Sequence, residues 1–150
     1  MSLVNLRAQS TSSALFLFLR RRILTSNSYR CLGVRGATTV EDNTAETILE
    51  ATRELLVAIV SANGIEVNDI GSVFFTTTCD LNAEYPAVAA RQLGWDDVAI
   101  MCAHEMNVPH GLRRCIRVLL LWNTQRTPQE IHHKYLHGAQ VLRPDRVFNS

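Results

Sequence analysis

The sequence predicts an α+β (α/β) domain in which a mixed β-sheet carries helices on one face. Segments of strand composition and segments of helical spacing follow one another in the order β, α, β, α, β, β, α, β. Residues 44–62 have the apolar period of a long amphipathic helix. The chain has 150 residues, of which 47% are hydrophobic and 19% charged, and this fits one domain with a single core.

The first predicted strand is residues 31–40, CLGVRGATTV, and we expect Arg35 to lie where it ends. The long helix follows. Asn43 and Glu46 have the spacing of a capping pair, and Gly64 is suited to end the helix. We expect the apolar stripe of this helix to cover the sheet, because its members recur three and four positions apart: Ile48, Leu49, Leu55, Leu56, Ile59 and Val60.

The middle of the chain predicts three more strands and a short helix. Residues 72–78, SVFFTTT, have strand composition, and Pro86 is suited to the first turn of a helix that ends near Leu93. Further strands are predicted at 97–102 and 114–123. The segment between them, AHEMNVPHG, has the composition of an irregular connection.

The last predicted elements are a helix over residues 127–136 and a short strand or extended tail over 139–144. Thr127 and Pro128 are suited to begin the helix, and Pro144 ends the tail. A body of about 120 residues buries only about two thirds of the surface that its unfolded chain exposes. We therefore expect the domain to gain core by forming an oligomer.

Residues 1–30 have the composition of an organellar transit peptide, because they are rich in Ser, Thr, Leu and Arg and lack acidic residues. We predict a transit peptide or disordered extension at 1–30 and a single domain at 31–150. Two alternatives stay open. A secretory signal would carry its positive charge before the apolar stretch, whereas Arg20–Arg22 follow it here. A start codon assigned upstream of the true one would also give such a segment.

Composition and motifs exclude several classes of function. Residues 31–150 hold ten of the fifteen Lys and Arg residues and all fourteen acidic residues, so this mildly acidic body predicts no nucleic-acid partner. The longest apolar run of the leader, ALFLFL, is too short to span a bilayer, and no membrane partner is predicted. His133 and His137 have helical spacing but no third ligand nearby, so no metal site is predicted. The cysteines have no paired spacing: Cys31, Cys79, Cys102 and Cys115.

Four arginines near strand ends are the candidate ligand-binding groups, in a body with a single lysine: Arg35, Arg91, Arg117 and Arg143. A guanidinium group binds both oxygens of a carboxylate through its forked donors. Arg117 is the sharpest candidate, because CIRVLLLW embeds its charge in an apolar strand, where a cation needs an anion. Two interpretations remain: Arg117 pairs with a local carboxylate such as Glu105, or it binds an anionic ligand.

Five blocks, spread over about residues 31–146, are the most specific feature: VRGATTVEDNTAETILEATRELL, LNAEYPAVAARQLGW, HEMNV, RCIRVLLLWNT and YLHGAQVLRPD. In content and order they resemble the Bacillus-type chorismate mutases. The resemblance implies a homotrimer in which mixed sheets form a pseudo-α/β-barrel, with active sites between neighbouring subunits. It also implies rearrangement of chorismate to prephenate, a step of phenylalanine and tyrosine biosynthesis, without any cofactor.

The resemblance also implies roles for particular residues. Arg117 would face the ether oxygen of chorismate, Arg35 would bind a carboxylate, and Glu105 would hold the ring hydroxyl. Cys102 would approach the same hydroxyl and Tyr135 the pyruvyl carboxylate. The remaining implied binding residues line a wall or the mouth of the cleft: Tyr85, Ala87, Arg91 and Arg143. The sequence departs from the Bacillus pattern at Val88, Met101, Pro109 and His110.

Two other functions and three compartments stay open. A ligand-binding trimer without turnover would use the same arginines, and an imine or enamine deaminase-like enzyme would have a similar assembly. Because the pathway that supplies chorismate lies in plastids in eukaryotes, the leader predicts the plastid. Mitochondrion is the alternative, or cytoplasm if the start codon is assigned too far upstream.

Overall fold

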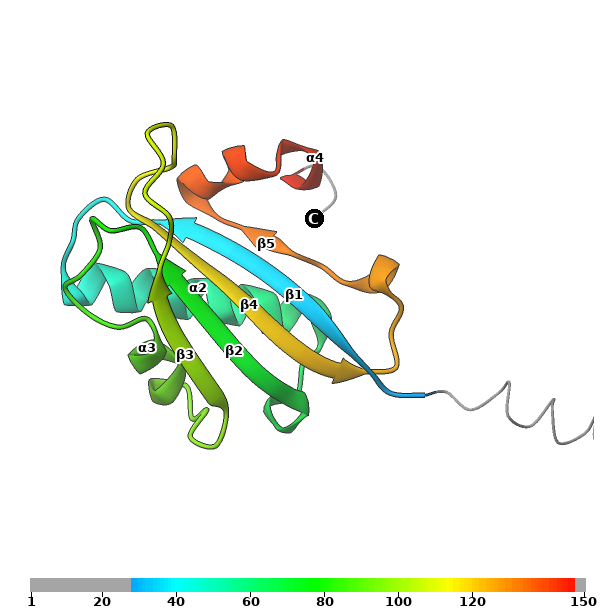
Figure 1. Cartoon of the computed structure of the whole chain (residues 1–150). Coiled ribbons are helices and arrows are strands. Elements are labelled where there is room, and N and C mark those ends of the chain that lie inside the picture. The colour runs from blue at the N-terminus through cyan, green and yellow to red at the C-terminus, as the bar shows by residue number, and fades with distance from the viewer. Residues whose placement is uncertain (1–27, 148–150) are drawn as a thin grey trace, which may run out of the picture.

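The computed structural model describes residues 28–147, which form one five-stranded mixed sheet with helices packed on it (Figure 1). Most of the predicted N-terminal extension, residues 1–27, lies outside the described residues. The mixed sheet with helices confirms the predicted fold class. The strands are β1 (Arg30–Thr39), β2 (Ile70–Thr77), β3 (Ala99–His104), β4 (Cys115–Thr124) and β5 (Lys134–Tyr135).

The order of strands across the sheet is β3-β2-β4-β1-β5. The central strand β4 runs antiparallel to both β1 and β2, whereas β3 is parallel to β2 and β5 is parallel to β1. In this register Arg117 lies between Ala37 of β1 and Thr76 of β2. The side chains of directly opposite residues point to the same face of a sheet, so these three share a face.

Helix α2 (Ala45–Asn63) lies across the back of the sheet in Figure 1, and α3 (Ala87–Gln92) lies beside it. We call the face that they cover the helix face. The main core lies here, where Leu55, Leu56 and Ile59 of α2 pack against alternate strand residues: Val34, Val73, Phe75, Val118, Leu120 and Trp122.

Gly36 lets α2 approach β1 closely. A Cβ atom at this position would lie 2.7 Å from Cδ1 of Ile59 and 3.0 Å from Cδ1 of Leu55. A larger side chain would force Ile59 and Leu55 to move and would crowd the backbone carbonyl of Lys134, 3.1 Å away. Gly36 thus fixes the helix against β1 beside Arg35.

The long helix confirms its predicted position, but a different residue caps it. Thr44 is the N-cap and accepts a hydrogen bond from the backbone N–H of Thr47, whereas Asn43 was the predicted cap. The Asn43 side chain instead accepts from the backbone N–H groups of Asn82 and Ala83. Gly64 ends the helix in the left-handed conformation (φ 63°), as predicted.

The prediction of a helix over residues 127–136 is wrong. The Thr127 and Glu130 capping box is present, but it opens only one 3₁₀ turn, η2 (Pro128–Glu130). The chain then extends, because Lys134 and Tyr135 pair with Gly36 and Ala37 of β1. Backbone pairing with a distant strand overrides the local helix signal here.

Two further expectations are also wrong. Residues 139–144 do not form a strand: they lie in η3 (His137–Leu142) and at the start of α4 (Pro144–Val147). Arg35 lies inside β1, opposite Leu119, and not at its end. Another 3₁₀ turn, η1 (Val67–Asp69), precedes β2.

The face of the sheet away from α2, which we call the open face, carries exposed apolar side chains beside its arginines. Leu119 is 39% exposed and Met101 60% exposed, and Phe74 lies between them in the register. η3 covers only the end of this face, where Ala139 packs on Ala37 and Cys115. Within residues 28–147 no helix has the length and apolar character needed to cross a membrane.

Candidate active site

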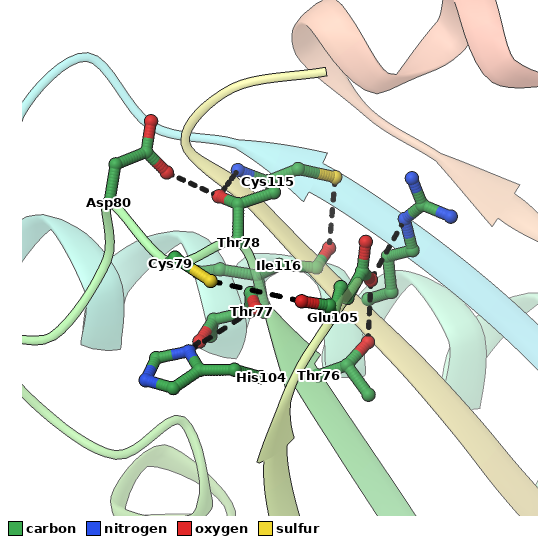
Figure 2. A network of polar contacts seen from close by, with 10 residues as sticks. Thr76, Thr77, Thr78, Cys79, Asp80, His104, Glu105, Cys115 and Ile116 are labelled. Atoms are coloured by element: carbon green, nitrogen blue, oxygen red, sulfur yellow. Dashed lines mark hydrogen bonds and ion pairs between the residues drawn. The ribbon is translucent and has the colours of Figure 1, made fainter. Parts of the chain in front are cut away.

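Three polar side chains meet at one edge of the open face: Thr76 of β2, Glu105 directly after β3 and Arg117 of β4. Figure 2 shows Thr76 and Glu105 pointing toward one another. β2 and β3 are parallel and end together, while the antiparallel β4 begins at the same edge. Glu105 follows β3 directly, and its backbone N–H donates to the carbonyl of Thr77. Thr76 Oγ1 donates to Glu105 Oε1 at 2.6 Å, and Arg117 Nε lies 3.0 Å from the same oxygen.

Arg117 and Glu105 lie close together, but their contact does not have the geometry of a hydrogen bond. Nε of Arg117 is buried, and no acceptor has the geometry of a hydrogen bond to it. The short distance to Oε1 therefore describes an ion pair by proximity. The Arg117 side chain is 41% exposed and the Glu105 side chain 16% exposed, so Arg117 pairs with Glu105 and still faces solvent.

Arg117 lines two neighbouring cavities. One, of about 430 Å³, lies over the open face between β4 and the C-terminal segment and is also lined by Arg35, Tyr135 and Arg143. The other, of about 490 Å³, is also lined by Glu105 and by the loop that follows it. Several guanidinium groups around one apolar-walled space suit a small ligand with more than one carboxylate.

Asp80 holds the loop that joins Glu105 to β4. Its carboxylate accepts from the backbone N–H of Arg114, from Arg113 Nε at 3.3 Å and from Thr78 Oγ1. Thr78 Oγ1 in turn accepts from the backbone N–H of Cys115. Desolvation raises the pKa of Asp80, but these hydrogen bonds together outweigh it and hold the pKa below its ordinary value. Asp80 thus fixes the turn that leads into β4, and β4 begins only two residues before Arg117.

A second group of predicted site residues lies on the helix face. Tyr85 and Cys102 line a cavity of about 360 Å³ between β3 and the segment that precedes α3. Burial raises the pKa of the Cys102 thiol, although a hydrogen bond from the backbone of Ala87 lowers it in part. Cys102 is therefore a neutral thiol at pH 7, suited to hydrogen bonding more than to nucleophilic attack.

The two remaining predicted arginines have local partners. Arg91 Nη1 donates to the carbonyls of Trp95 and Asp96, and Arg91 lines none of the three cavities described above. Arg143 donates to Asp145 through Nε (2.9 Å) and Nη2 (2.8 Å), and this raises its pKa further. Arg143 lines the cavity that Arg35 and Arg117 share.

The two histidines considered as metal ligands have different partners. The Nδ1 atom of His133 accepts from the backbone N–H of Arg35 at 3.1 Å, and His137 Nε2 lies 2.9 Å from Glu54 Oε2. In the part of the chain that the structure describes, no group of three His, Cys, Asp or Glu side chains could hold a metal ion.

Comparison with known proteins identifies the family of the chain. Residues 31–146 match the family model described as chorismate mutase type I. The chain belongs to this family. A chorismate mutase AroH from Thermus thermophilus is 49% identical over 114 residues, which are 75% of this chain and 93% of the relative. The corresponding protein of Bacillus subtilis is 44% identical over 114 residues, covering 75% and 90%.

A solved structure supports the fold of this family member. A chorismate mutase from Clostridium thermocellum is 48% identical and superposes with a TM-score of 0.73, covering 73% of this chain and 98% of the other. The family resemblance drawn from the five sequence blocks is therefore confirmed. The roles of individual residues stay predictions.

Sequence reasoning missed three residues that the structure brings to the site: Thr76, Asp80 and His133. Thr76 is one of three consecutive threonines at a predicted strand end, and alternation along the strand could have placed it on the face opposite the core. Asp80 and its partner Arg113 are 33 positions apart in the sequence. His133 and its partner Arg35 are 98 positions apart. No local pattern could have indicated them.

Proposed function

We propose that this protein catalyses the rearrangement of chorismate to prephenate. The observation that carries the proposal is that Arg117 lines the cavity of Arg35 and Tyr135 while it pairs with Glu105. The reaction is unimolecular and moves no proton in its chemical step. It needs only that one conformer of the substrate is selected and that developing charge is stabilised.

Arg117 stabilises the transition state. In this rearrangement the C–O bond breaks ahead of C–C bond formation, so negative charge grows on the ether oxygen. A guanidinium group that is already in place at that oxygen binds the transition state more tightly than the ground state. The 41% exposure of the Arg117 side chain leaves it accessible to substrate in the cavity.

Arg35, Tyr135 and Glu105 position the substrate. Arg35 and Tyr135 line one cavity, where they bind the pyruvyl carboxylate and hold the side chain over the ring. Glu105 accepts a hydrogen bond from the ring hydroxyl through the carboxylate oxygen that Thr76 does not occupy. Arg143 lies at the mouth of the same cavity, as a second cation for the anionic substrate.

The active protein is a homotrimer with its sites between subunits. Two observations support this. The open face exposes Phe74, Met101 and Leu119, which a neighbouring subunit would bury. The predicted site residues also fall into two groups on opposite faces of one sheet, so one subunit cannot direct both at one substrate. In the trimer, the group of Tyr85, Ala87 and Cys102 completes the arginine group of the neighbour, with Arg91 at its rim.

The test is the disappearance of chorismate, followed in the ultraviolet with purified residues 28–150 and no added metal or cofactor. We expect turnover to prephenate well above the spontaneous rate. The rate should change little between pH 6 and 9, because arginine stays protonated and the chemical step transfers no proton. A folded protein that gives only the spontaneous rate would contradict the proposal. Neither a non-catalytic trimer nor a deaminase is favoured, since the matched family and the relatives named above are chorismate mutases by description.

We expect His133 to affect substrate binding through Arg35. Phenylalanine in place of His133 removes the acceptor for the Arg35 backbone N–H, and we expect KM to rise by about threefold to tenfold from the loss of this one exposed hydrogen bond. Asparagine puts an oxygen close to the Nδ1 position and should keep KM within about threefold of wild type. Steady-state kinetics of His133→Phe and His133→Asn check this. Equal KM values for both variants would contradict it.

We propose that the leader, residues 1–30, directs the protein to the plastid. Support comes from its composition, with no acidic residue and several arginines. The named relatives are from bacteria and give the plastid no support, and they fit the cytoplasmic alternative. A fluorescent protein fused to residues 1–30 should enter isolated plastids and lose the leader. Import into mitochondria alone, or no import, would contradict the proposal.

A further inference from the structure

Thr76 is a strand residue whose hydroxyl contacts the predicted catalytic pair. Its Oγ1 donates to Glu105 Oε1 at 2.6 Å, a short distance for a hydrogen bond to a carboxylate (Figure 2). In the β-ladder Thr76 lies directly opposite Arg117. The single oxygen Oε1 thus accepts from the threonine hydroxyl and also lies 3.0 Å from Arg117 Nε.

This geometry differs from what an arginine and a carboxylate adopt without constraint. Such pairs favour two parallel N–H···O bonds, which use both carboxylate oxygens. Here the short contact of the pair is made through Nε, and that N–H is not aligned with the oxygen. A fully bidentate pair would neutralise the guanidinium and occupy both Glu105 oxygens. Two guanidinium donors and both carboxylate oxygens would then be directed at each other and not at a substrate.

We propose that Thr76 is a positioning residue that holds Glu105 by one oxygen and so prevents the carboxylate from closing on Arg117 in a bidentate pair. The inference rests on the proposed function. It assigns to the hydroxyl two effects: the second oxygen of Glu105 stays free for the ring hydroxyl, and the charge of Arg117 stays directed at the ether oxygen. Thr76 acts through these two residues, and it lines the cavity that Arg117 shares with Arg35 and Tyr135.

Two substitutions separate the hydroxyl from the shape of the side chain. Thr76→Val has nearly the same volume and the same branching but no donor, whereas Thr76→Ser keeps the donor. We expect kcat of Thr76→Val to fall by about tenfold to a hundredfold, the range for losing one hydrogen bond to a charged group. Thr76→Ser should stay within about threefold of wild type. Both variants should elute as the wild-type oligomer.

A double-variant cycle shows whether Thr76 acts through Glu105. In a Glu105→Ala background, Thr76→Val should cause no further loss of kcat, because the group that it positions is absent. A merely structural role would give the same loss in both backgrounds. Additive losses, or a serine variant as impaired as the valine variant, would overturn the inference.

A crystal structure of Thr76→Val tests the geometry independently of activity. We expect the Glu105 carboxylate to turn so that both oxygens contact the Arg117 guanidinium. An unmoved carboxylate overturns the inference whatever the rates. Wild-type protein without turnover would overturn the proposed function, and the crystal structure would still decide the role of Thr76.

Discussion

Replacing Arg117 with glutamine is expected to lower kcat by about a hundred- to a thousandfold, or roughly 3 to 4 kcal/mol of barrier. The glutamine amide can still donate a hydrogen bond but carries no charge for the developing negative charge on the ether oxygen. The loss should appear in kcat and kcat/KM together, because the interaction is made mainly in the transition state. Steady-state kinetics with chorismate measure both.

The Arg117 variant needs two controls. Removing the cation leaves Glu105 without its ion-pair partner, and an unpaired carboxylate repels an anionic substrate. The double variant Arg117→Gln with Glu105→Gln removes that repulsion, and we expect it to stay impaired in kcat. Arg113→Gln is the matched control, because Arg113 is an exposed arginine on the neighbouring loop that pairs with Asp80. It should keep kcat near wild type. A kcat of Arg117→Gln within tenfold of wild type would remove Arg117 from the mechanism.

Placing an aspartate at Leu119 is expected to abolish both the trimer and the activity. Leu119 is 39% exposed in the isolated subunit, so the fold should tolerate the charge. In the proposed trimer the same side chain is buried, and burying an added carboxylate costs several kcal/mol in desolvation, which the neighbouring Arg35 offsets only in part. Sedimentation equilibrium should show monomers. The chorismate rate should fall to that of the spontaneous reaction, because each site needs two subunits.

Val57→Asp is the matched control for assembly. Val57 is also an exposed aliphatic residue, at 48%, but it lies on α2 and not on the open face. We expect this variant to remain a trimer with full activity. A Leu119→Asp protein that stays trimeric and active would show that the open face is not the interface.

The elements that the sequence predicted best depend on local pattern. The apolar spacing of α2 and the composition of β2 and β4 reflect burial that each segment needs by itself. The prediction of a helix over residues 127–136 failed because the structure there depends on a distant strand and not on local pattern. Thr127, Pro128 and Glu130 do begin a helical turn, but Lys134 and Tyr135 then gain backbone partners on β1. Residue spacing carries no information about such a partner almost a hundred positions away.

The candidate site, too, could be predicted from the sequence only in part. The five sequence blocks indicated which residue types to expect, and Arg35, Glu105 and Arg117 do lie on or beside one face of the sheet. What they could not indicate is the register that puts Thr76 opposite Arg117, or the separation of Cys102 from the arginines. Register follows from the pairing of whole strands and from the bulge between Ile70 and Ser72.

The division of the site between the two faces of each sheet has a genetic consequence. An allele defective only in the arginine group and an allele defective only around Cys102 would each give a null phenotype alone. In a cell that expresses both, every mixed copy of the proposed trimer would contain one cleft built from an intact arginine group of one subunit and an intact Cys102 group of its neighbour. Such alleles would complement each other, whereas two alleles altered on the same face would not.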